Sequence, residues 1–168
     1  SERIYLANGN PSAIATSDDG SFAYVAGTNN HLYKIDTATD SVVADWSDAL
    51  GFRVGPPGPI GLSPDGSRAY VGLSDDSVTI NLEAELSVID TASGAILAAV
   101  PLAATPEDIA IDTEGRYIYI SQPTLNSVAV IDSRRNRVLT YITGFDTPGA
   151  IADPREPPVT YLFRDGFE

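Results

Sequence analysis

Two irregular segments of this sequence hold most of the side chains that could do chemistry. The first covers residues 48–59 and contains Phe52 and Arg53 among several glycines and prolines. A guanidinium on such a loop can clamp a carboxylate or a sulfate through two parallel hydrogen bonds. The competing interpretation is an exposed arginine that pairs with Asp48 or Asp75 at the surface.

The second segment covers residues 74–85 and contains the carboxylates of Asp75, Asp76, Glu83 and Glu85. Carboxylate oxygens suit Ca²⁺, which takes roughly 6–8 hard ligands. The spacing differs from that of an EF-hand loop, so we interpret this segment as a solvated acidic loop and predict no metal site.

His31 is the only histidine of the chain, which has no cysteine. One imidazole cannot build a multi-histidine copper or zinc site, and no nucleophile stands beside it in a recognisable motif. We therefore predict no catalytic residue and no cofactor. Trp46 and Phe52 either pack between repeats or offer a stacking surface for a sugar or peptide. The candidate binding residues are Arg53, Phe52, Asp75, Asp76 and His31.

The charge of the chain limits its partners. The 168 residues carry a formal net charge of −13. An acidic surface repels phosphate backbones and anionic lipid, so we predict no nucleic-acid binding and no membrane insertion. No apolar run approaches the roughly 20 residues that span a bilayer. Because the sequence starts at Ser1 with neither Met nor a signal peptide, we expect that an upstream segment was removed or left out.

An internal repeat sets the positions of these residues. The turn glycines Gly20, Gly66 and Gly115 are 46 and 49 residues apart, which matches a four-stranded propeller blade of roughly 40–50 residues. Each repeat has an Ile-led strand, a tight turn, a Tyr-containing strand, a strand ending in Asp, and a fourth apolar strand. These elements fall at residues 14–20, 22–25, 32–37 and 42–43; 60–66, 69–71, 86–91 and 96–97; and 109–115, 117–120, 128–132 and 138–139.

The acidic clusters Asp18-Asp19-Gly20 and Pro64-Asp65-Gly66 recur at one place in the repeat. Such recurrence favours turn chemistry over calcium binding, because Asp side chains accept hydrogen bonds from their own backbone in turns. Another turn of the third repeat holds the basic cluster Arg134-Arg135-Asn136-Arg137, which we interpret as solvated.

Three motifs resemble the YVTN β-propeller repeat family. They are Ile60–Gly66, Tyr70-Val71 and Val88–Thr91, and related motifs return in the other two repeats. Asp18 and Glu114 depart from the usual Pro-Asp of the first motif. The resemblance implies an all-β fold of four-stranded antiparallel blades, as in surface proteins, lactonase-like enzymes and quinoprotein amine dehydrogenase subunits. The resemblance also implies a ring of about seven blades, within the range of roughly 4–8 for propellers in general, so the chain resembles the C-terminal part of one.

By this reading residues 1–168 form one partial propeller domain. Residues 1–10, with Arg3–Leu6, are the last strand of a preceding blade, and Gly149–Ala152 and Val159–Phe163 begin a further blade. The full blades and the last segment cover residues 11–55, 56–105, 106–147 and 148–168. We expect either missing N-terminal blades or a second copy to cover the open sheet faces.

The two irregular segments belong to the end of a propeller opposite its tight turns. Loops on a rigid scaffold concentrate binding groups, so we expect a non-catalytic binding or structural module for a protein, peptide or glycan. The alternative is half of a lactonase-like or quinoprotein-type enzyme whose active site needs further blades. The end of the chain, Phe163–Glu168, resembles short tails of some secreted Gram-negative proteins, which implies a secreted, periplasmic or cell-surface bacterial protein. The alternative is a plain strand end followed by a turn.

Overall fold

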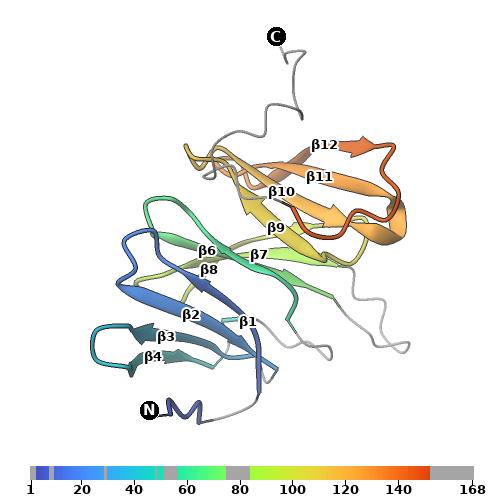
Figure 1. Cartoon of the computed structure of the whole chain (residues 1–168). Coiled ribbons are helices and arrows are strands. Elements are labelled where there is room, and N and C mark those ends of the chain that lie inside the picture. Colours follow the sequence, from blue (N-terminus) through green and yellow to red (C-terminus); the bar gives the residue numbers. More distant parts are fainter. Residues whose placement is uncertain are drawn as a thin grey trace.

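The chain folds into three four-stranded antiparallel sheets that follow one another in chain order (Figure 1). The computed structural model describes residues 3–7, 10–28, 30–47, 49–50, 57–74 and 84–151. The first sheet contains β1 (Pro11–Thr16), β2 (Phe22–Gly27), β3 (Leu32–Asp36) and β4 (Ser41–Trp46). The second contains β5 (Ile60–Leu62), β6 (Arg68–Leu73), β7 (Glu85–Asp90) and β8 (Ile96–Pro101). The third contains β9 (Asp108–Ile111), β10 (Tyr117–Gln122), β11 (Ser127–Asp132) and β12 (Arg137–Thr143).

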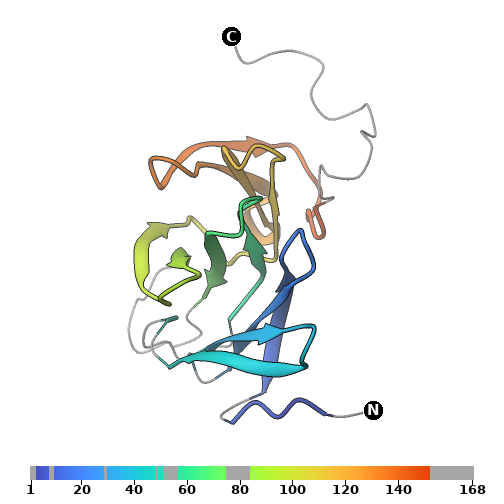
Figure 2. The same cartoon turned by 90° about the vertical axis from the view of Figure 1, so that its left-hand side faces the viewer.

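Each sheet is a simple meander in which every strand pairs with the next one along the chain. The first strands lie in contact, β1 beside β5 and β5 beside β9, and Figure 2 shows the three sheets from the side. A single 3-10 turn, η1 (Pro123–Leu125), interrupts the strands of the described residues. The predicted all-β class and the three four-stranded antiparallel sheets are confirmed.

Two apolar cores lie between the sheets. Tyr24 and Leu32 of the first sheet share one core with Val71 of the second. Tyr70 of the second sheet shares the other core with Ile118 of the third. Because successive side chains of a strand point to opposite faces, Tyr70 and Val71 reach different cores. Burial on both faces explains why β6 has only apolar or aromatic side chains from Ala69 to Leu73 and does not alternate.

The repeat motif ends β3, β7 and β11 with an aspartate that caps the following turn. Asp36, Asp90 and Asp132 each accept hydrogen bonds from the amides two and three residues later. The next residue joins the two turns of its sheet, because its hydroxyl donates to the carbonyl of the turn glycine between the first two strands. These clasps are Thr37–Gly20 and Thr91–Gly66 at 2.6 Å and Ser133–Gly115 at 2.5 Å.

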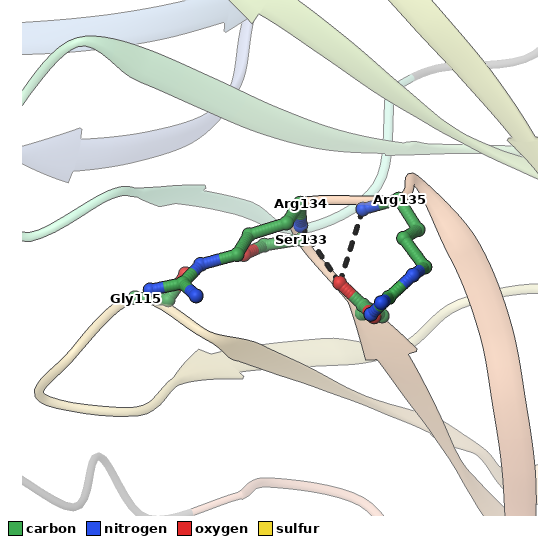
Figure 3. A network of polar contacts seen from close by, with 5 residues as sticks. Gly115, Ser133, Arg134 and Arg135 are labelled. Atoms are coloured by element: carbon green, nitrogen blue, oxygen red, sulfur yellow. Dashed lines mark hydrogen bonds and ion pairs between the residues drawn. The ribbon is translucent and has the colours of Figure 1, made fainter.

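Figure 3 shows this arrangement in the third sheet, where the amides of Arg134 and Arg135 point at the carboxylate that ends β11. Arg135 also reaches back with its guanidinium to Asp132 Oδ2 at 2.7 Å. This contact raises the pKa of Arg135 and lowers the pKa of Asp132. Part of the predicted solvated basic cluster therefore also caps its own turn, while the Arg135 side chain stays 68% exposed.

The expected partial blades form no strand in the described residues. Arg3–Leu6 lies outside any strand, and Leu6 packs on the first sheet beside Val25 and Ile35. Residues 149–151 are likewise outside any strand, and residues 159–163 lie outside the described part. A strand needs a neighbour to accept its backbone hydrogen bonds, so the assignment of these segments to further blades stays a prediction.

Candidate functional site

The candidate site is a groove at the end of the molecule where β1, β5 and β9 begin, called here the loop end. It has a volume of about 430 Å³. Residues 12–14, 57–60 and 106–108, one stretch from each sheet, line it. The opposite end, called the turn end, carries the capped turns described above. Three repeats thus contribute equivalent positions to a single concave surface.

A proline stands three residues before the first isoleucine of each repeat. Pro11 precedes Ile14, Pro57 precedes Ile60, and Pro106 precedes Ile109. Proline has no amide hydrogen and is tolerated where a strand begins. The sequence analysis did not use this spacing, although it indicates that the three strand starts are equivalent.

The strand starts approach one another closely. The Ser12 hydroxyl donates to the Pro57 carbonyl at 2.5 Å and joins the first and second repeats. Gly72 lies behind the groove, where a Cβ would stand 2.7 Å from Cγ of Pro106. Only glycine avoids this clash, so the residue lets the linker of the third repeat reach the second sheet.

The polar groups of the groove are mostly acceptors. Asp108 receives the amides of Ile109 at 2.9 Å and of Ile151 at 2.6 Å, so its carboxylate also fixes the chain after the third sheet. Glu107 is anchored through its backbone, because its amide donates to the Ser121 carbonyl at 3.0 Å, while its side chain stays exposed. Carboxylates at this surface suit a ligand that donates hydrogen bonds or carries positive charge.

Gln122 stabilises the loop end from within the third sheet. Its side chain is fully buried, and its Nε2 donates to the Ala104 carbonyl at 2.6 Å. The bond holds the linker that leads to Pro106 against the third sheet. Neither Gln122 nor this linker was among the predicted site residues, because the contact joins residues 18 positions apart.

Of the five predicted binding residues, the structure describes His31. Arg53, Phe52, Asp75 and Asp76 lie outside the described residues. His31 Nδ1 is 2.5 Å from Oδ1 of Asp45, and its ring stacks on Tyr33 with centroids 5.5 Å apart. It does not line the groove, and these contacts fix the edge of the first sheet. Trp46 packs against the core between the first two sheets.

The acidic clusters at the turn end cap their own turns, as predicted. Asp19 accepts from the Ser17 hydroxyl at 2.6 Å and from the Ser21 amide at 2.9 Å. These bonds, the Ser17 contact foremost, lower the pKa of Asp19 to about 2. Asp65 repeats the pattern with Ser63 and Ser67, and its pKa is also lowered.

Two properties of the described residues concern other function classes. No group of three or more His, Asp or Glu side chains that could hold a metal ion occurs among them. None of their helices is both long and apolar enough to cross a membrane.

Comparisons with known proteins show a similarity of fold and indicate neither a family nor a function. No protein-family model matches the chain, and no curated protein matches its sequence. Among solved structures 1065 chains match. One is the "Kuenenia stuttgartiensis Hydrazine Synthase", with a TM-score of 0.64, 24% identity, and coverage of 80% of this chain. The match spans 37% of that chain. A fold shared this widely does not indicate a function.

Proposed function

We propose that the chain is an arc of a YVTN-type β-propeller that works as a binding module. Its loop end presents a surface to a protein, peptide or glycan outside the cytoplasm, in a secreted, periplasmic or cell-surface setting. The main support for a binding role is that three equivalent strand starts line one groove of about 430 Å³. The groove falls within the range of small-molecule and peptide sites.

Three observations support the propeller part of the proposal. The first strands of successive sheets lie beside one another, and the sheets share apolar cores in sequence order. Radial repetition of four-stranded meanders around their first strands is the construction of a propeller. The similarity at a TM-score of 0.64 over 80% of the chain agrees with a large repeated β fold.

The charge of the loop end narrows the ligand. Glu107 and Asp108 line the groove, and the chain carries a net charge of −13. Anionic ligands would be repelled, whereas the hydroxyls of a neutral glycan or the amines of a basic peptide find acceptors here. The irregular segments 48–59 and 74–85 belong to this end by their place in the repeat and would extend the surface.

Binding of a neutral oligosaccharide panel and of a Lys/Arg-rich peptide panel tests the proposal. We expect one panel to contain a ligand whose affinity falls when Glu107 is replaced by Gln. The matched control is Glu114→Gln at the turn end, which removes the same charge from another exposed side chain. Equal affinity of both variants, or no binding by either panel, would contradict a loop-end site.

A further inference from the structure

The face of the first sheet that points away from the second sheet carries an unusual apolar groove. Its volume is about 280 Å³, and Ile4, Leu6, Ile14, Val25 and Ile35 contribute to its lining. Exposed apolar surface of this kind marks an interaction site more often than chance placement.

Comparison of equivalent positions shows that this face, unlike its counterparts on the second and third sheets, has no sheet packed against it among the described residues. Ile14 and Ile60 occupy the same position, three residues after Pro11 and Pro57. Ile60 is 8% exposed because it lies in the core between the first and second sheets, whereas Ile14 is 64% exposed. The outer face of the first sheet thus exposes apolar side chains whose equivalents in the second sheet are buried.

A polar contact also repeats from sheet to sheet. Lys34 of the first sheet donates to the Thr91 carbonyl of the second at 3.5 Å, a long bond. Arg68 of the second sheet donates to the Ser133 carbonyl of the third at 3.0 Å. In both cases a cation reaches the residue that follows the capping aspartate of the next sheet. The equivalent acceptor on the first sheet is the carbonyl of Thr37.

We propose that the outer face of the first sheet docks a further four-stranded antiparallel repeat sheet that carries a Lys or Arg aimed at Thr37. That cation stands either two residues after the turn glycine, as Arg68 does, or two residues before the capping aspartate, as Lys34 does. The inference rests on the repeat architecture of the proposed function and is independent of the loop-end ligand.

A second copy of this chain is the competing occupant, and its residues fit less well. A copy that continues the order of the sheets would offer the outer face of its third sheet. That sheet holds Tyr117 at the position of Arg68 and Val130 at the position of Lys34. The nearby Arg116 is paired with Glu114 at 2.9 Å. Apolar contact would remain, but the cation that reaches the carbonyl of Thr37 would be missing. In addition, two chains that each carry a net charge of −13 repel each other.

The absence of cysteine from the sequence permits a clean test by thiol labelling. Ile14→Cys introduces a reporter on the open face, and Ile60→Cys is the matched reporter in the covered one. In the natural chain Ile14→Cys should react with a maleimide at least about tenfold faster, since labelling follows the access of the thiol. An extended chain replaces residues 1–10 by a copy of residues 57–105, which includes Arg68.

In the extended chain we expect the Ile14→Cys rate to fall to the Ile60→Cys rate, and Arg68→Ala in the added copy to restore part of it. An unchanged rate overturns the proposal, and so does an added repeat that circular dichroism shows to be unfolded. Slow, concentration-dependent labelling of the natural chain, with a dimer mass by light scattering, would assign the face to a second copy. Ligand binding at the loop end, measured on the same proteins, reports separately on the proposed function.

Discussion

Trp46 of the first sheet lies directly over Gly94 in a turn of the second. A Cβ on Gly94 would stand 2.2 Å from the indole Cγ, and the glycine has a φ of +76°. The indole therefore occupies the space that any side chain at this turn would need. The pair joins the outer strand of one sheet to the turn end of the next.

Gly94→Ala should lower the free energy of unfolding by about 2–4 kcal/mol, because it combines a left-handed backbone with overpacking. Gly20→Ala is the matched control, with a φ of +70° and no atom within 4 Å of the added Cβ. It should cost only about 1 kcal/mol from backbone strain. Urea denaturation measures both, and equal losses would mean that the indole moves aside freely.

The Thr91 hydroxyl gives a second prediction. It donates to the Gly66 carbonyl at 2.6 Å, and the residue is 5% exposed. Thr91→Val should cost about 1–2 kcal/mol, since it leaves a carbonyl without its partner. Thr91→Ser should stay within about 0.5 kcal/mol of the natural chain, because Ser133 makes the same contact in the third sheet. A stable valine variant would show that the clasp contributes nothing to folding.

Lys34 gives a third prediction. Its ammonium lies 4.0 Å from the ring centroid of Phe22 and also reaches the Thr91 carbonyl. Lys34→Met should lower the free energy of unfolding by about 1 kcal/mol, because the apolar stem remains while the cation–π contact and the hydrogen bond are lost. Lys34→Arg should retain most of the stability. If Lys34→Met is more stable than the natural chain in thermal unfolding, burying the Lys34 ammonium destabilises the fold, and its contact between the sheets is not stabilising.

Acid should weaken the fold through the turn aspartates. Hydrogen bonds lower the folded-state pKa of Asp65 and Asp90 below the ordinary 3.8, and that of Asp19 to about 2. A lowered folded-state pKa contributes stability that is present above the unfolded pKa and lost as pH falls through the folded value. The urea midpoint should therefore drop between about pH 4 and pH 2. A flat profile there, or an unaltered slope in Asp65→Asn, would contradict this account.

The sequence predicted those parts of the fold that repeat. The Asp-Gly turns and the Ile-Asp strand ends indicated the four-stranded units, because a capping aspartate and a tight turn act within a few residues. The contacts between sheets were missed. Lys34 to Thr91 spans 57 positions, and Arg68 to Ser133 spans 65. Such pairs depend on how two sheets pack, which no local pattern encodes.

The site was predicted less well than the fold. The strand starts were interpreted as connections, and most of the predicted site residues, which belong to the two irregular segments, lie outside the described part. The prolines Pro11, Pro57 and Pro106 share a spacing before each repeat's isoleucine. Their convergence on one groove became evident only when the first strands were placed side by side.

The clasps from Thr37, Thr91 and Ser133 each close within a single repeat. The two turns of each repeat are therefore joined from within that repeat, and no clasp among the described residues involves the loop end. Evolution can lengthen or rewrite the connections at the loop end of one repeat without disturbing the fixed ends of its neighbours. The two longest irregular segments, 48–59 and 74–85, are predicted to lie at the loop end from their place in the repeat. The architecture thus combines one end with a constant turn geometry and another end whose connections can differ in length and sequence from repeat to repeat.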